Sequence, residues 1–133
     1  MFFVDLYSFK EDEEGESKAA TTTLEEEQAE EEEAFYCLNC GSTITSKKQR
    51  ITVEQSHEHT FVNPGGFVFH IGCFRKAPGC LQAGESSAEH SWFSGYAWNY
   101  ALCASCFTHL GWIYHSTDQE SFYGLILDRL VFF

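Results

Sequence analysis

Two Cys-x-x-Cys pairs, Cys37/Cys40 and Cys103/Cys106, constrain this chain more than any other feature of its sequence. Two residues between paired cysteines let both sulfur atoms face one point, and two such turns supply the four thiolates of a tetrahedral zinc site. The pairs are 62 residues apart, so the metal would join two distant parts of one domain. Because four thiolates leave no open coordination position, we expect one structural Zn²⁺ rather than a catalytic ion.

A redox dithiol or free structural cysteines are the alternatives for these pairs. Two further cysteines, Cys73 and Cys80, have an uncommon ligand spacing, and we expect small buried residues or loop thiols rather than a second metal site. His57 and His59 would project from one side of a strand, but two ligands alone make a weak site.

Negative charge is concentrated at the N-terminal end of the chain. Residues 1–36 hold 13 of the 20 acids and two bases, whereas residues 37–133 hold seven acids and six bases and are nearly neutral. Residues 1–35 are therefore predicted to be an acidic, disordered tail, a solubilising segment rather than a specific interaction arm, and residues 36–133 the folded domain. The body lacks the clustered Lys and Arg that neutralise phosphates, which argues against nucleic-acid binding.

No segment has the roughly 18 consecutive apolar residues of a membrane span. The apolar start, Met1–Val4, is too short for a signal peptide and runs directly into Asp5. Paired cysteines that bind a metal as thiolates indicate a reducing compartment. We therefore expect a cytoplasmic monomer without a membrane partner.

Sequence patterns predict a mainly β domain. Alternating apolar and polar residues, rich in β-branched and aromatic types, predict strands at 50–55, 60–62, 66–71, 111–115 and 124–130. Asn63–Gly66 is a strong turn signal, and residues 72–88, with Gly, Pro, Ala and Ser, are expected to form loops. No segment has a long helical period, so the strands should form antiparallel sheets with long connections.

All three tryptophans lie between residues 92 and 112, beside the second cysteine pair. Trp92, Trp98 and Trp112 could be core residues. However, small neighbours such as Gly95 and Gly111 would let backbone approach a ligand. A nearly uncharged aromatic site suits either a methylated ammonium held by cation–π attraction or a neutral ring whose edge is read by backbone groups.

Several segments together resemble the thalidomide-binding (CULT) domain of the cereblon family. The resemblance rests on the order of the two cysteine pairs and three segments between residues 36 and 130, namely 61–68, 89–98 and 109–114. It implies a β-tent fold, in which two antiparallel sheets are pinned by the structural zinc, and identifies the chain as a stand-alone single-domain member.

The resemblance also implies a ligand site. Trp92, Trp98 and Trp112 would form a tryptophan cage for a cyclic imide, with Tyr114 closing one side. Backbone groups of His90 and Trp92 would meet the imide N–H and one carbonyl. The remaining residues expected around the pocket are Asn63 over its mouth, Phe67 on its rim and Glu89 beside the cage. Expected ligands are glutarimide-type rings, thalidomide-like compounds, imide-cyclised peptide C-termini and uracil-type rings.

The chain departs from the family pattern at the rim and at its N-terminal end. Gly65 replaces a His, while Phe67 and Phe69 stand where the family often has Tyr and His, so altered ligand selectivity is expected. An acidic segment stands where cereblons have a large N-terminal domain, so no ubiquitin-ligase assembly surface is expected.

We expect a binding module rather than an enzyme. Glu89 and His90 are a conceivable acid–base pair for imide hydrolysis, but neighbours on a strand point to opposite faces. One alternative is a related methionine sulfoxide reductase, which would need a nucleophilic cysteine in an Arg-x-Cys-x-Asn pattern that is absent here. The other is a reader of methylated ammonium groups, which a series of charged ligands would distinguish.

Overall fold

The computed structural model describes residues 33–132 of the 133-residue chain. The predicted acidic tail therefore lies outside the described residues up to position 32, and its last residues, Ala34 and Phe35, belong to the first strand. The described part is β-structure with two short 3₁₀ helices, η1 (Lys47–Gln49) and η2 (Leu127–Arg129). Its strands are β1 (Ala34–Cys37), β2 (Thr43–Ser46), β3 (Glu58–Val62), β4 (Val68–Phe74), β5 (Cys80–Ser87), β6 (Ala97–Cys103), β7 (His109–His115), β8 (Phe122–Ile126) and β9 (Leu130–Phe132).

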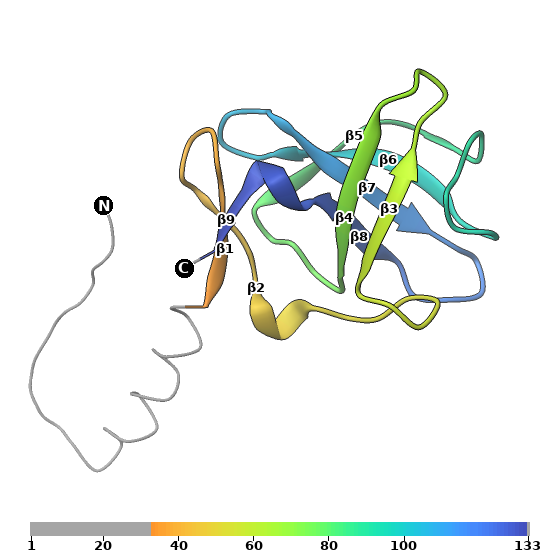
Figure 1. Ribbon diagram of the computed structural model, residues 1–133, viewed down its shortest axis with the longest axis horizontal. Coiled ribbons are helices and arrows are strands. Elements are labelled where there is room, and N and C mark those ends of the chain that lie inside the picture. Colours follow the sequence, from red (N-terminus) through yellow and green to blue (C-terminus); the bar gives the residue numbers. More distant parts are fainter. Residues whose placement is uncertain (1–32, 133) are drawn as a thin grey trace, which may run out of the picture. The chain divides into compact units, whose positions relative to one another are not determined.

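The strands form two antiparallel sheets, which confirms the predicted fold class (Figure 1). The small sheet has the order β2-β1-β9, and the large sheet the order β3-β4-β8-β7-β6-β5. Every pairing is antiparallel. Within residues 33–132, neither 3₁₀ helix has the length or apolar character needed to cross a membrane.

The two faces of the large sheet bury different sets of residues, because alternate side chains of a strand point to opposite sides. One face packs against the small sheet and includes Phe74, Ile113 and Leu125, which share a core with Phe35 and Ile44. The other face carries a second, mostly aromatic core, made of Ile71, Cys73, Phe93, Trp112, Tyr114, Phe122 and Ile126. Aromatic side chains therefore make up most of the core on this second face of the large sheet.

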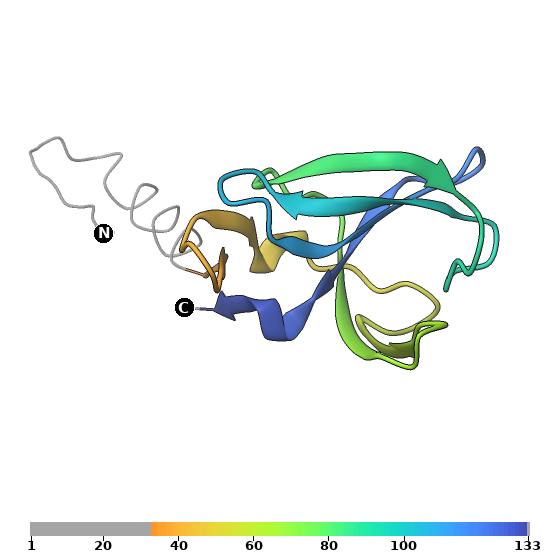
Figure 2. The ribbon, with the colours of Figure 1, turned by 90° about the horizontal axis from the view of Figure 1, so that it is seen from above.

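A loop at residues 88–96 covers part of this aromatic face. It follows β5 and precedes β6, and it reaches from that side of the large sheet towards the β3–β4 hairpin (Figure 2). Phe93 of this loop is fully buried and contacts Tyr114 of β7 and Phe122 of β8 edge to face, with ring centroids 4.9 and 5.1 Å apart. Phe93 thus anchors the loop to the sheet.

The structure corrects two secondary-structure predictions. The strand predicted at 50–55 is wrong: this segment makes only isolated bridges and turns at Glu54 and Gln55, whose positive φ angles end any extended pattern. The loop predicted at 72–88 is also wrong, because β4 continues to Phe74 and β5 occupies Cys80–Ser87. The predictions at 60–62, 66–71, 111–115 and 124–130 each overlap a strand, although the last one continues into η2 and β9.

Candidate functional site

The four paired cysteines converge on one point between the sheets. Cys37 ends β1 in the small sheet and Cys103 ends β6 in the large sheet, and each begins a turn that carries its partner. Sγ atoms lie 3.7 Å apart for Cys37 and Cys106, and 3.6 Å apart for Cys40 and Cys103. All four sulfur atoms lie within 4.8 Å of one another. A tetrahedron of sulfurs about 2.3 Å from zinc has edges of about 3.8 Å, so the cluster fits one Zn²⁺.

The two turns have the same backbone geometry. Gly41 N–H donates to the Cys37 carbonyl, and Phe107 N–H donates to the Cys103 carbonyl, both at 2.8 Å. The residue after the second cysteine has a positive φ in each turn, 84° at Gly41 and 65° at Phe107. Only the first turn uses the residue type that adopts this conformation without strain.

Polar side chains around the sulfurs favour thiolates. The pKa of the Cys106 thiol falls to about 6, first because of its contact with the Thr108 hydroxyl at 3.0 Å and then because of the Asn39 amide, which donates at 3.3 Å. Burial raises the pKa of Cys103, but a contact with the Ser42 hydroxyl and backbone hydrogen bonds outweigh it, so the net shift is downward. Burial raises the pKa of Cys37 to about 11, so zinc binding would displace its proton.

Zinc held by these four cysteines would have a structural role. Four thiolates complete a tetrahedral coordination shell and leave no position for water or substrate. The ion would connect the β1–β2 turn of the small sheet to the β6–β7 turn of the large sheet. Asn39, Ser42 and Thr108, which support the thiolates, were not predicted from the sequence, because nothing in the spacing distinguishes them from other polar turn residues.

A group of four rings forms around Trp92, and we call Phe61, Phe69, Trp92 and Trp112 the aromatic cluster. Trp92 stacks on Phe61 with centroids 4.7 Å apart and meets Trp112 edge to face at 4.9 Å. Phe69 lies 5.3 Å from Trp112 and 6.0 Å from Trp92. The cluster joins the β3–β4 hairpin, loop 88–96 and β7, which are distant in sequence.

The register of β6 and β7 places Trp98 beside this cluster. Trp98 pairs with Tyr114, and Tyr100 pairs with Trp112, so all four side chains lie on one face of the two strands. Trp98 and Trp112 are therefore diagonal neighbours. The Trp98 indole N–H donates to the Glu89 carbonyl at 2.8 Å, which fixes its ring against the start of loop 88–96.

Backbone groups at His90 and Trp92 have no partner among the described residues 33–132. Within the described part of the chain, neither residue forms a hydrogen bond through its N–H or C=O. His90 is exposed and has a φ of 57°, a conformation that favours glycine. Loop 88–96 is instead closed by Ser91, whose hydroxyl donates to the Phe93 carbonyl at 3.0 Å.

The other residues predicted around the pocket lie in the β3–β4 turn, in the second core and at the start of loop 88–96. Asn63 closes the β3–β4 turn, because its Oδ1 accepts the Phe67 N–H at 2.9 Å. Phe67 lies at the tip of this turn and is 68% exposed. Tyr114 is almost fully buried and stacks on Phe122 with centroids 5.1 Å apart, as part of the second core. Glu89 is exposed and contributes its carbonyl to Trp98.

Phe61 and His109 were not predicted as site residues, and Phe69 was named only as a departure from the family pattern at the rim. For Phe61 and Phe69, the sequence signal was their place in two alternating segments joined by a tight turn. The pairing of β3 with β4 puts these two rings opposite each other on one face. His109 meets the Trp112 ring edge to face at 5.0 Å. Burial lowers the pKa of His109, and its Nε2–H donates to the Gly111 carbonyl at 2.9 Å.

Within residues 33–132, the remaining cysteines and the paired histidines take part in no cluster of metal-binding side chains. Cys73 is fully buried, and burial raises the pKa of both Cys73 and Cys80 to about 12. Such thiols are poor nucleophiles, which disfavours the reductase alternative. His57 and His59 instead bind backbone carbonyls of Ile51 and Val53, each at 3.0 Å.

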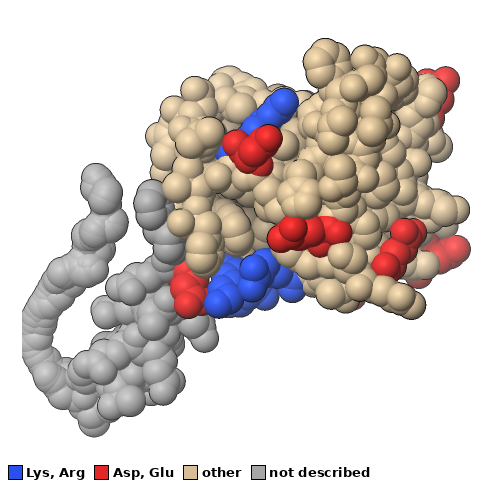
Figure 3. Space-filling view, viewed as in Figure 1, with Lys and Arg blue, Asp and Glu red and all other residues tan. Residues whose placement is uncertain are grey.

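The visible surface of the described part is mostly uncharged. Figure 3 shows a small basic patch near η1, a helix that carries Lys47 and Lys48, and a separate basic group higher on the same face, each with acidic residues beside it. Glu33 forms an ion pair with Lys47 at 3.8 Å. This face has no extended basic groove of the kind that tracks a nucleic-acid backbone.

Comparison with known proteins places the chain in a family. A family profile described as "Yippee zinc-binding/DNA-binding /Mis18, centromere assembly" matches residues 33–128. Protein cereblon of Gallus gallus and that of Danio rerio are each 34% identical over 101 residues, covering 71% of this chain and 23% of each relative. Protein cereblon of Xenopus tropicalis is 33% identical over 100 residues, or 71% and 22% of the two chains.

The matched region includes both cysteine turns and the aromatic cluster. This chain spans less than a quarter of the length of these cereblons. The profile, however, covers nearly all of the described domain. The chain is therefore a member of the Yippee-Mis18 family of zinc-binding domains and a homologue of the cereblons.

Proposed function

We propose that this domain is a binding module for cyclic imides, with Trp92, Trp98 and Trp112 as the walls of its site. The observation that carries the proposal is the unpaired backbone of His90 and Trp92 beside the aromatic cluster. A cyclic imide presents an N–H between two carbonyls, so its edge needs one backbone acceptor and one backbone donor. Aromatic walls suit its uncharged, nearly flat ring.

The strained backbone at His90 supports this proposal. A non-glycine residue in the left-handed region costs about 1–2 kcal/mol, and such strain is found where surrounding contacts fix a functional geometry. Phe93 on one side and the Trp98–Glu89 hydrogen bond on the other hold this segment. A fixed backbone edge would bind a ligand with little ordering cost.

The similarity to thalidomide-binding domains supports the same ligand class. Glutarimide-type rings, thalidomide-like compounds and imide-cyclised peptide C-termini share the imide edge, and uracil-type rings present a similar one. The domain would act as a binding module without catalysis of its own. Buried Cys73 and the closed zinc site supply neither an exposed nucleophile nor an open metal position.

Isothermal titration calorimetry of the zinc-loaded protein would test the imide edge. Glutarimide should bind saturably, whereas N-methylglutarimide should not, because its methyl group removes the donor and blocks the backbone contact. Equal binding of both compounds would contradict recognition of the imide N–H by the protein backbone. Tetramethylammonium belongs in the same series, since preferential binding of this cation would instead favour a reader of methylated ammonium groups.

Replacement of a cage wall tests where the imide binds. Trp112→Ala should weaken glutarimide binding at least about 30-fold, the typical effect of removing a dominant aromatic contact. Phe132→Ala is the control, because Phe132 is an exposed ring in the small sheet, away from the aromatic cluster. Both variants should retain one zinc per chain by mass spectrometry of metals. Unchanged affinity in Trp112→Ala would contradict the proposed site.

A further inference from the structure

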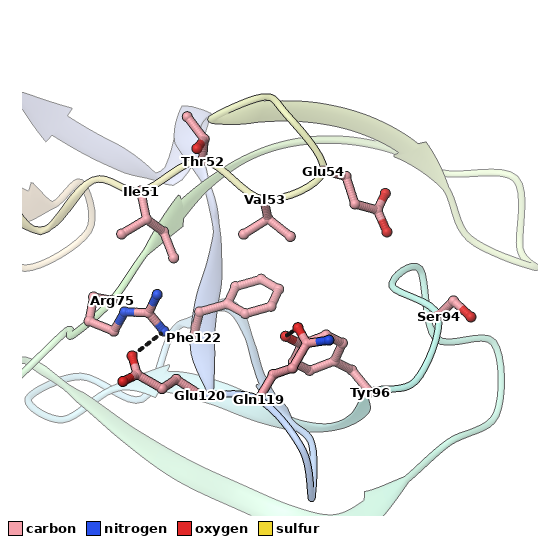
Figure 4. Close-up of a pocket in the computed structure, with 10 residues that line it drawn as sticks. All are labelled: Ile51, Thr52, Val53, Glu54, Arg75, Ser94, Tyr96, Gln119, Glu120 and Phe122. Carbon is pink, nitrogen blue, oxygen red and sulfur yellow. Dashed lines mark hydrogen bonds and ion pairs between the residues drawn. The ribbon is translucent and has the colours of Figure 1, made fainter.

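A cavity of about 460 Å³ lies between several connecting segments and the start of β8. Its walls come from residues 51–54 before β3, from Arg75 directly after β4, from the end of loop 88–96 and from the β7–β8 connection (Figure 4). None of the three tryptophans lines it, and neither does His90. It is therefore separate from the proposed imide site.

Apolar side chains face one another across this cavity. Ile51 and Val53 point from one wall towards Phe122 and Tyr96 on the other (Figure 4). Tyr96 packs edge to face on Phe122, with centroids 5.2 Å apart, and its hydroxyl donates to Gln119 at 2.6 Å. Two rings and two branched side chains provide a surface for an apolar or aromatic ligand.

The charges around the cavity leave one carboxylate without a counter-ion. Arg75 pairs with Glu120 at 3.1 Å and donates to the Ser121 carbonyl at 3.0 Å. Glu54, which also lines the cavity, forms no ion pair or hydrogen bond with any described residue. With two carboxylates and one guanidinium among its lining residues, the cavity therefore has a net negative charge that would attract a cation.

A strained turn sets the position of Glu54. Glu54 and Gln55 have φ angles of 52° and 73°, and Val53 and Ser56 exchange backbone hydrogen bonds of 2.9 and 3.2 Å around them. Two successive positive φ angles define a tight turn that prefers Asn-Gly. Glu54 and Gln55 therefore both adopt a backbone conformation that their residue types disfavour. The turn holds Glu54 at the rim of the cavity.

We propose that this cavity binds an amphipathic organic cation, namely an apolar or aromatic body that carries one ammonium or guanidinium group. The body packs against Phe122 and Tyr96, and the cation meets the Glu54 carboxylate. This chemistry is shared by free amines and by Lys or Arg side chains of a peptide. The proposal does not depend on imide binding at the tryptophans.

Chemical-shift titration of the full, zinc-loaded, ¹⁵N-labelled chain tests the site directly. The probes are 4-phenylbutylamine and 4-phenylbutanol, which share a body and differ in charge. The amine should shift the amide signals of Glu54, Tyr96 and Gln119 saturably, and the alcohol should bind about threefold more weakly, as expected for one exposed ion pair. Equal affinities, or shifts confined to another part of the domain, would overturn the proposal.

Matched variants separate the charge of Glu54 from the charge of the whole chain. Glu54→Gln should weaken amine binding about threefold, to the level of the alcohol. Glu85→Gln removes the same charge from an exposed position on β5 outside the cavity, and it should bind the amine like the unmodified protein. Amine binding unaffected by Glu54→Gln would overturn the assignment, because both variants remain observable as folded proteins in the same spectra.

A peptide probe distinguishes the two sources of the cation. N-acetyl-Phe-Lys-amide carries an aromatic body and an ammonium group on a peptide backbone. Tighter binding of this peptide than of the amine would support a basic side chain as the ligand, and weaker binding would support a free amine. Failure of both probes to shift the cavity signals would overturn the proposal.

Discussion

Gln55 adopts a backbone conformation that its side chain disfavours, with a φ of 73°. Gln55→Gly should raise the free energy of unfolding by about 0.5 kcal/mol. Relief of the left-handed conformation is worth about 1–2 kcal/mol, and the greater flexibility of glycine in the unfolded chain offsets about 0.5–1 kcal/mol of it. Urea denaturation of the zinc-loaded protein would measure the difference.

Gln82 provides the matched control for this substitution. It is exposed in β5 and has no positive φ. Gln82→Gly should lower the free energy of unfolding by about 0.5–1 kcal/mol, because glycine in a strand only adds flexibility to the unfolded chain. If both variants lose stability equally, strain at Gln55 is not the explanation.

Individual site residues differed in how well the sequence indicated them. The zinc ligands were predictable because cysteine spacing alone defines a coordinating turn. By contrast, Phe61 and Phe69 reach Trp92 only because the β3–β4 hairpin lies against a loop some 30 residues later. The burial of Tyr114 depends on Phe93, which covers it from loop 88–96. Such contacts depend on long-range packing that local patterns do not contain.

The close pairing of β7 with β8 depends on Gly111, which precedes the cage residue Trp112. A Cβ at Gly111 would collide with the carbonyl oxygen of Gly124 and lie 2.9 Å from Leu125 Cα, both of which are backbone atoms. Since backbone cannot move aside as a flexible side chain can, Gly111→Ala should cost about 3 kcal/mol or more of folding stability. A thermal unfolding scan would detect the loss.

Gly65→Ala is the control for this substitution. A Cβ there would meet nothing closer than the Asn63 side chain at 3.5 Å, which is ordinary contact. We expect a change within about 0.5 kcal/mol, as for most surface substitutions. A similar change of stability in both variants would mean that the pairing of β7 with β8 tolerates a methyl group at Gly111.

Strands were predictable where apolar and polar residues alternate, and less so elsewhere. β5 is an edge strand of small and polar residues with an irregularity between Ala83 and Ser87, where Gly84 has a φ of 79°. Its strand conformation follows from pairing with β6 rather than from its composition. Residues 50–55 are the opposite case: their sequence alternates like a strand, but a turn at Glu54 and Gln55 prevents strand formation.

At the scale of the whole domain, we expect the two sheets to need zinc in addition to their shared core. The sheets share one apolar core, but the first cysteine turn belongs to the small sheet and the second to the large one. Structural zinc contributes about 10–16 kcal/mol of binding free energy in small domains. A typical domain is stable by only about 5–15 kcal/mol, so the metal-free domain has little or no stability left.

Zinc removal should therefore unfold the domain cooperatively. A strong chelator should abolish the near-ultraviolet circular dichroism of the buried aromatic residues, and added zinc should restore it. Cys103→Ser should behave like the chelated protein, because three thiolates hold zinc less tightly than four. Cys80 pairs directly with Cys103 across β5 and β6 but is not a ligand, so Cys80→Ser should keep both zinc and signal. A chelated protein that retains its dichroism and its Tm would mean that the shared core alone holds the two sheets together.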